Sequence, residues 1–494
     1  MGGGEGQTSR SPAKGAKSHR VSKKKVTRKD IHKAAAGADG IATLIKKLVK
    51  QIKEGDAEIQ ESAASALRQI SSMDHGAHSE ALYKAKAIKP LVGLLSTGIA
   101  TAQGNASAAL AGIAAQKPEH QAELVKAGGI QPLVALLKTG SAKVQEEAAS
   151  ALAALDADVS HQQEAIKAGV IPALINLLKN GSVVAQAAAA QATANAAAYS
   201  HAAQRLISQG GAIPLLLVLL GVGKAQKPAA SALAKLAHSN KEIQGEIANS
   251  GGIAALLPLL NGLDVDVQVQ AAAALEEIAQ DNCETQSAIA KTGGIGPLLA
   301  LLSSRSCAAQ SHGMAALAQL ARHNRDNQDS IARSGGIKPL VQLLEAPSED
   351  PDVLSCAARA IMETAGGNLA NQKAVVDYGG ISMLANLIKN SRSEVVLSEV
   401  AGALWSLAAG ETLDETSPVT AGQRVVCRLR RPICPAPACH LPSLPLASRL
   451  QPPSRCSHSS PLTPPPVRTR RRDLHLHRRG QQHPAPRQSA RRRR

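Results

Sequence analysis

The sequence predicts an all-α solenoid of about nine three-helix repeats, and three observations carry that prediction. First, a phrase close to Gly-Gly-Ile-x-Pro-Leu-x-x-Leu-Leu recurs nine times, with its Ile at positions 41, 88, 130, 171, 213, 253, 295, 337 and 381. Steps of 40 to 47 residues are typical of helical units that stack because one unit alone buries too little apolar surface. Second, an independent Gln marker shares this period. Third, one Trp, three Tyr and no Phe leave a core of Ala, Leu, Ile and Val, among which Ala and Leu are strong helix formers.

Residues 120–155 serve as the model unit and predict three helices in order. A short first helix over 121–127 stops at Gly128 and Gly129, because glycine reaches positive φ at low cost and turns the chain sharply. Pro132 then lies in the first turn of the second helix, where its missing N–H is not needed. Ser141 is the predicted N-cap of the third helix, whose inner stripe is spaced three and four residues apart.

The same pattern returns along the chain. Gly pairs stand at 210–211, 251–252, 293–294, 335–336 and 379–380, a single Gly stands at 169, and the second unit has Lys86-Ala87 instead. The Gln marker of the first helix stands at 121, 163, 204, 244, 286, 328 and 372, and three residues after each comes Leu, Ile or Val. Agreement of two independent markers on one period supports a repeat array.

The pattern resembles the armadillo repeat, whose third helix closes with a run seen here at residues 401–408, AGALWSLA. The resemblance covers roughly residues 34–410, and the Gly-Gly turn favours armadillo over HEAT repeats. It implies a right-handed superhelix whose third helices line a concave groove holding an extended peptide or a partner domain. The likeness is specific for the fold and unspecific for the partner.

Armadillo proteins of the importin alpha type present a Trp and, four residues on, an Asn in the third helix of successive units. Aligned through the Ala-Leu-x-x-Leu-Ala run, the Asn position reads Gln69, Gly112, Ala154, Asn195, Lys235, Glu277, Gln319, Glu363 and Ser406. The Trp position reads Ser65, Ala108, Ser150, Gln191, Ser231, Ala273, Ala315, Arg359 and Gly402. One residue is Asn and none is Trp, so the chain lacks the side chains by which that type grips a nuclear localisation signal.

The side chains that remain at these positions are polar and of mixed charge. The predicted partner-binding groove comprises Gln191, Asn195, Lys235, Glu277, Gln319, Arg359, Glu363 and Ser406. One interpretation is a surface whose amide and charged groups hydrogen-bond a partner protein or extended peptide. The other is an ordinary solvated helix face. The leading functional prediction is a non-enzymatic interaction scaffold, and the alternative is a diverged nuclear transport adaptor of the importin alpha type.

No motif in the chain indicates catalysis. GxxxxGK[ST], HExxH and GxSxG are absent, as is a GxGxxG that follows a strand and opens a helix. Glu276 and Glu277 are adjacent on a predicted helix, so their side chains point to different sides and do not form an acid–base pair. We therefore expect no enzymatic activity, no cofactor and no metal site.

The basic character of the chain lies at its two ends. The net charge is +18, of which residues 1–33 carry +8 (ten Lys or Arg against two acids) and residues 418–494 carry +16 (seventeen Arg against one Asp). The intervening segment is therefore 18 − 8 − 16, or −6, so the solenoid is not a basic nucleic-acid platform. We expect nucleic acid to bind weakly, and only through the tails.

Residues 1–33 are predicted to be a disordered basic tail, because they lack the apolar content to fold. Lys23, Lys24, Lys25, Arg28 and Lys29 form a candidate nuclear import signal. The equally weighted alternative is a solvated tail without an address.

Residues 411–494 are predicted to be a disordered Arg- and Pro-rich tail. From residue 418 on there are fourteen Pro, seventeen Arg and no Lys, a composition that favours translated noncoding sequence, that is, a gene-model artefact, over a functional tail. The chain has seven Cys without a disulfide framework, no apolar signal core at its start and no apolar run long enough to span a membrane. These features predict a cytoplasmic or nuclear protein.

Overall fold

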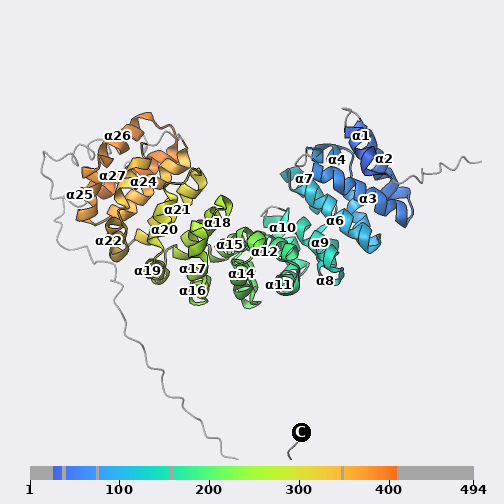
Figure 1. Cartoon of the computed structure of the whole chain (residues 1–494), viewed down its shortest axis with the longest axis horizontal. Helices are drawn as coiled ribbons and strands as arrows, with labels where there is room; N and C mark the ends of the chain where they lie inside the picture. The colour runs from blue at the N-terminus through green and yellow to red at the C-terminus, as the bar shows by residue number, and fades with distance from the viewer. Residues whose placement is uncertain (1–25, 36–39, 74–76, 156–158, 346–349, 409–494) are drawn as a thin grey trace, which may run out of the picture. The chain divides into compact units, whose positions relative to one another are not determined.

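The computed structural model describes residues 26–35, 40–73, 77–155, 159–345 and 350–408. Within these ranges the secondary structure is helical and no strand occurs (Figure 1). The helices follow one another as nine sets of three, which confirms the predicted all-α armadillo solenoid of nine repeats. Most of the predicted N-terminal tail and the whole predicted tail 411–494 lie outside the described residues.

Each repeat consists of a short first helix, a second helix and a longer third helix. The first helices are α1 (Arg28–Ala35), α4 (Ser79–Lys84), α7 (Pro118–Lys126), α10 (Val159–Lys167), α13 (His201–Gln209), α16 (Lys241–Asn249), α19 (Cys283–Lys291), α22 (Arg325–Arg333) and α25 (Leu369–Asp377). The second helices are α2 (Gly40–Glu54), α5 (Ile88–Thr97), α8 (Ile130–Thr139), α11 (Val170–Asn180), α14 (Ala212–Leu219), α17 (Gly252–Leu256) with the 3-10 helix η2 (Leu257–Asn261), α20 (Ile295–Leu301), α23 (Ile337–Leu343) and α26 (Gly380–Asn390). The third helices are α3 (Ala57–Ser72), α6 (Ala100–Ala114), α9 (Ala142–Ala153), α12 (Val183–Ala197), α15 (Gly223–Ala237), α18 (Val265–Ala279), α21 (Cys307–Ala321), α24 (Pro351–Ala365) and α27 (Glu394–Ala408).

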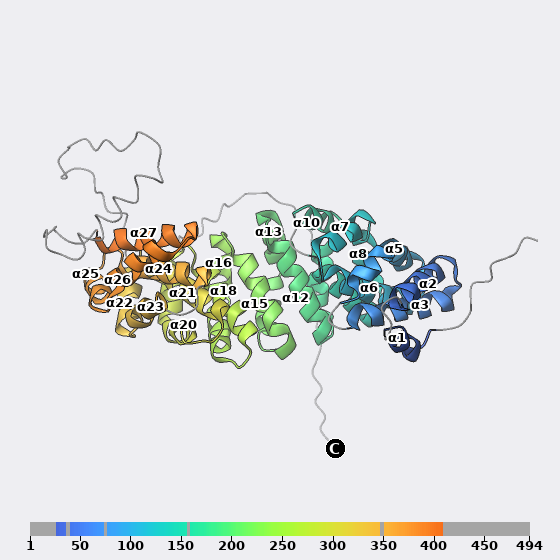
Figure 2. The same cartoon turned by 90° about the horizontal axis from the view of Figure 1, so that it is seen from above.

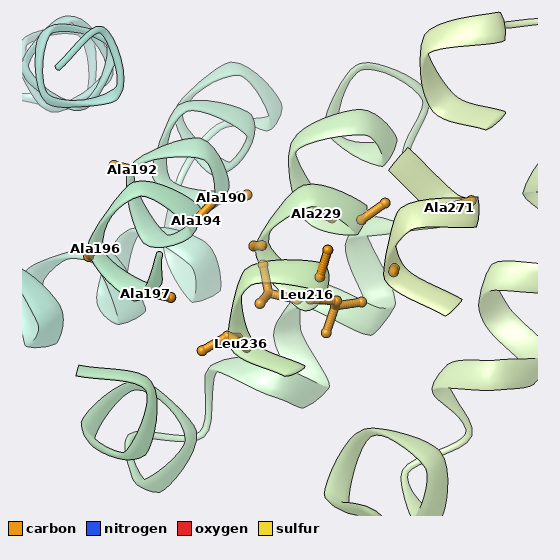
Figure 3. Close-up of a cluster of buried hydrophobic side chains, with 14 of the residues drawn as sticks. Ala190, Ala192, Ala194, Ala196, Ala197, Leu216, Ala229, Leu236 and Ala271 are labelled. Carbon is orange, nitrogen blue, oxygen red and sulfur yellow. The ribbon is translucent and has the colours of Figure 1, made fainter. Parts of the chain in front are cut away.

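The repeats stack through their third helices. Every third helix from α3 to α24 contacts the third helix of the next repeat, as Figure 2 shows for α12, α15 and α18. Small buried side chains allow this contact: Figure 3 shows Ala194 of α12, Leu216 of α14, Ala229 of α15 and Ala271 of α18 in one cluster, and all four are buried. Third helices that meet through Ala place any polar side chain of their outer face close to the neighbouring repeat.

The two glycines of the turn between first and second helices have different physical reasons. Gly128 has φ 74°, in the left-handed region where a Cβ is strained. In the second repeat Lys86 adopts the same conformation, with φ 57°. Gly129 is needed for space instead, because a Cβ there would lie 2.5 Å from Leu124 Cδ1 on the first helix. The turn therefore fixes how the first helix packs on the second.

The Gln marker of the first helix is a buried connector between third helices. Gln244 Nε2 donates to Ala237 O at the end of α15 (3.2 Å) and to Glu277 O near the end of α18 (2.9 Å). Its Oε1 accepts from Asn282 Nδ2 of the next repeat (3.1 Å). The last carbonyls of a helix lack partners within that helix, so one amide here satisfies the ends of two neighbouring helices and joins three repeats.

The marker recurs with the same use in other repeats. The amides of Gln121, Gln162, Gln204, Gln286, Gln328 and Gln372 each donate to a carbonyl at the C-terminal end of a third helix or of the loop after it. In the fourth repeat the prediction of Gln163 was wrong by one position. Gln162 is buried and donates to Asn195 O (2.6 Å), whereas Gln163 is exposed, because α10 begins one residue earlier relative to the pattern.

The solenoid begins earlier than the predicted boundary at residue 34. Helix α1 starts at Arg28, and Ile31 is only 2% exposed against the neighbouring helices. Thr27 and Asp30 form a capping box, in which the Thr27 amide donates to Asp30 Oδ2 (2.9 Å) and the Asp30 amide donates to Thr27 Oγ1 (3.4 Å). Residues 28–33 are therefore helical rather than part of a disordered tail.

The predicted caps of the third helices are partly correct. Ser141 is the N-cap of α9, as predicted, but its side chain accepts no capping hydrogen bond. Ser182, at the same place before α12, accepts one from Ala185 N (3.2 Å). The position of the helix start is therefore set by the turn as a whole rather than by the serine hydroxyl.

Candidate partner-binding face

The predicted site residues occupy equivalent places in successive helices. The Asn-position residues, from Gln69 to Ser406, are each the thirteenth residue of their third helix as counted from its start, and the Trp-position residues are each the ninth. Residues four apart lie on one side of a helix, so the two positions form a row along the stacked helices. We call this row the third-helix face.

Asn195, the one Asn in the row, is used inside the fold. Its Nδ2 donates to Ala153 O (3.1 Å) and Leu155 O (2.5 Å) at the end of the preceding third helix. Its Oδ1 accepts from Gln191 Nε2 (3.1 Å), one turn earlier on α12. Both predicted residues of this repeat are therefore brought together, with much of their hydrogen-bonding capacity already taken.

Glu277 and Lys235 lie on adjacent helices of the row, and Lys235 is exposed. The Glu277 carboxylate is bonded to His238 Nδ1, at 3.1 Å from Oε1 and 3.0 Å from Oε2. Burial raises the pKa of Glu277, opposed by the His238 hydrogen bond and, more weakly, by the nearby Lys235 charge. A half-buried carboxylate of this kind gains from a further cation or hydrogen-bond donor.

Arg359 and Glu363 of α24 face different neighbours. The Arg359 Nε and Nη2 atoms donate to Glu399 Oε1 of α27, at 3.0 and 2.6 Å, and this hydrogen bond is the main cause that raises the pKa of Arg359. Glu363 Oε1 lies 3.9 Å from Arg322 Nε. Burial raises the pKa of Glu363, with the Arg322 charge opposing it. Its partner is therefore at the limit of an ion pair.

The two remaining predicted residues differ in exposure. Gln319 is half-buried, and none of the described residues donates to its buried Oε1 atom. Ser406 is only 9% exposed, and its hydroxyl donates to Met362 O of the preceding repeat (2.9 Å). The prediction that Ser406 lines an open groove was wrong, because a short hydroxyl at this place reaches the neighbouring helix and not the surface.

Sequence reasoning missed the residues that bridge one repeat to the next. Glu276 Oε2 is bonded to His312 Nδ1 of the following third helix (2.9 Å), so Glu276 and Glu277 do point to different sides. Near the N-terminus, Arg68 reaches Asn105 Oδ1 (3.3 Å) and, two repeats on, Glu147 Oε1 (3.0 Å). The available signal was complementary side chains about one period apart along the chain.

The described residues give no sign of a metal site, since no group of three or more His, Cys, Asp or Glu side chains comes together in them. Cys356 lies near Arg359 on α24, and burial raises the pKa of its thiol to about 11, which keeps it protonated at neutral pH. No single described helix is long and apolar enough to span a membrane, although α13 and α14 together meet that criterion on length and composition, bent by 81°.

The candidate import signal is only partly described. Lys23, Lys24 and Lys25 lie outside the described residues, whereas Arg28 and Lys29 are exposed in the first turn of α1. Its role stays a prediction.

Comparison with known proteins identifies the family. A family model for the armadillo/beta-catenin-like repeat matches residues 117–154, 158–198, 240–280, 324–361 and 368–409. The crystal structure of an engineered protein from a structural genomics consortium is 34% identical, with a TM-score of 0.65, and the match covers 78% of this chain and 92% of that one. A designed armadillo repeat protein is 32% identical, with a TM-score of 0.44, over 47% of this chain and 99% of that one. No curated protein sequence matches the chain.

The chain is thus a helical repeat solenoid with the architecture of an interaction scaffold. It belongs to the armadillo repeat family, whose members commonly mediate protein interactions and are generally non-enzymatic.

Proposed function

We propose that this protein is a non-enzymatic scaffold that binds segments of partner proteins along the third-helix face. The observation that carries the proposal is the state of Glu277 and Glu363. Both carboxylates are held partly desolvated on the same position of their helices, with side chains 23% and 20% exposed, and burial raises the pKa of each. A fold gains no stability by desolvating a charge without a strong partner, so such groups are typical of binding surfaces.

The partner is proposed to be an extended or helical protein segment that supplies hydrogen-bond donors or cationic side chains to these carboxylates. The transport-adaptor alternative gains no support, because the one Asn of the ladder, Asn195, is bonded to Ala153 O and Leu155 O. The proposal includes a cytoplasmic or nuclear location, which microscopy of the tagged protein tests.

The direct test is reversal of the two charges. A Glu277→Lys, Glu363→Lys double variant should weaken binding of an identified partner, while circular dichroism shows unchanged helicity. The matched control reverses Glu242 and Glu284, which are exposed on the first helices α16 and α19 and give the same change in net charge. Equal affinity of the two double variants for the partner would remove the third-helix face from the proposal.

A further inference from the structure

The C-terminal side of the ninth repeat, α25–α27, keeps the features by which one repeat receives the next. The twelfth residue of a third helix packs on the following third helix: Glu276 bonds His312 (2.9 Å), and a Cβ on Gly402 would lie 2.7 Å from Met362 Sδ. In α27 the twelfth residue is Trp405, and it is 61% exposed. A large apolar side chain therefore stands where the interior repeats make their stacking contact.

A buried acceptor lies on the same side. In two interior junctions the Gln marker accepts from the N-cap Asn of the next repeat, Gln204 Oε1 from Asn240 Nδ2 and Gln244 Oε1 from Asn282 Nδ2, both at 3.1 Å. Gln372 is 5% exposed and its Nε2 is bonded to the end of α27, but none of the described residues donates to its buried Oε1. A buried amide oxygen without a donor costs about 1 to 3 kcal/mol.

Leu369 completes this surface. It is the first residue of α25 and is 60% exposed. Arg325 has the same place in α22, and its Nη1 donates to Gly367 O in the loop that leads into the next repeat (2.8 Å). The first residue of a first helix therefore faces the junction with the following repeat. We call Leu369, Gln372 and Trp405 the repeat-nine face.

We propose that the repeat-nine face docks a helical unit of another protein, which enters as the first helix of a further repeat would, with an Asn at its N-cap. The Asn amide donates to Gln372 Oε1, and a Gly or Ala of the partner packs on Trp405, as Gly402 does on Met362. The interior N-cap Asn follows the thirteenth residue of the preceding third helix by five positions, which here gives Glu411. A carboxylate has no proton to donate at neutral pH, so the donor comes from another chain.

Trp405 is the single Trp of the chain, so its fluorescence reports on this face directly. The probe is a synthetic peptide of residues 239–280, the sixth repeat, which contains no Trp and starts at the Asn240 cap. Added to the full chain, it should shift Trp405 emission to shorter wavelength and reduce quenching by acrylamide. An Asn240→Asp peptide keeps the helix cap but lacks the donor, and should bind about tenfold more weakly, the equivalent of one buried hydrogen bond.

A second format removes the dependence on folding of a free peptide. The same segment, with Asn240 or with Asp, is inserted after Ala408 of the full chain, and only the Asn form should protect Trp405. On the receiving side, Leu369→Ser should weaken peptide binding, whereas Val395→Ser, an equally exposed apolar residue of the same repeat at 59%, should not.

Three results would overturn the proposal. Equal effects of the Asn and Asp forms in both formats would show that the amide is not recognised. Protection of Trp405 that grows with protein concentration alone would assign the face to a second copy of the chain. Increased quenching of Trp405 after removal of residues 409–494 would assign it to the chain's own segment.

Discussion

Replacement of Gln244 by Met tests whether the amide connectors hold neighbouring repeats together. Gln244 is 1% exposed and makes three hydrogen bonds, to Ala237 O, to Glu277 O and from Asn282 Nδ2. Met has a similar volume and no donor, so packing is largely kept while all three bonds are lost. At about 1 kcal/mol each, their loss should cost about 3 kcal/mol, and each buried group left without a partner adds about 1 to 3 kcal/mol more.

Because repeat arrays unfold in parts, the assay for this variant must be local. Hydrogen–deuterium exchange with mass spectrometry should show amides of α16, α18 and α19 exchanging roughly 150-fold faster, the equivalent of about 3 kcal/mol, while the second repeat stays unchanged. Gln163→Met, at an exposed Gln, is the control. A change below about threefold in α16 to α19, where 1 kcal/mol already gives about fivefold, would refute the view that this amide joins the repeats.

Three further predictions follow from single sites. Gly128→Ala should lower stability by about 1 to 2 kcal/mol because of the positive φ, and Gly128→Asn should recover part of the loss; equal melting temperatures of the two variants would contradict this. Since burial raises the pKa of Glu277, the folded chain binds this proton more readily than the unfolded one. The stability due to Glu277 should therefore rise as pH falls through the raised pKa and level off below the ordinary 4.5, and Glu277→Gln should lack that increment in denaturation at several pH values. With a thiol pKa of about 11, Cys356 should be alkylated at pH 8 more slowly than the exposed Cys283, as peptide mapping measures; a faster Cys356 would be inconsistent with its burial.

The fold was predictable because each repeat states it again. The Gly128–Gly129 turn, Pro132 and the apolar spacing recur, so an error in one unit is corrected by the others. Errors remained where a unit departs from the pattern. The extra Gln before Gln163 shifted the marker by one position, and the capping box of Thr27 began a helix inside a segment whose composition resembles a tail.

The candidate site was predictable in position and not in state. The ninth and thirteenth positions follow from helix periodicity, and both were found on the same face. Which of their groups remain available depends on neighbours 33 to 44 residues away in the sequence, as for Asn195 with Leu155 and Ser406 with Met362. Those contacts depend on how closely two helices stack, which the Ala-rich interface sets and periodicity alone does not.

Site-specific photocrosslinking tests most directly whether partners bind the third-helix face. A photoreactive amino acid is placed at Lys235, the exposed thirteenth residue of α15, or at Val218, which is 71% exposed on the second helix α14. The account predicts that Lys235 forms a specific crosslink to a partner protein and that the Glu277→Lys, Glu363→Lys variant reduces it, while Val218 forms none. Crosslinking of the same partner from Val218 and not from Lys235 would contradict it.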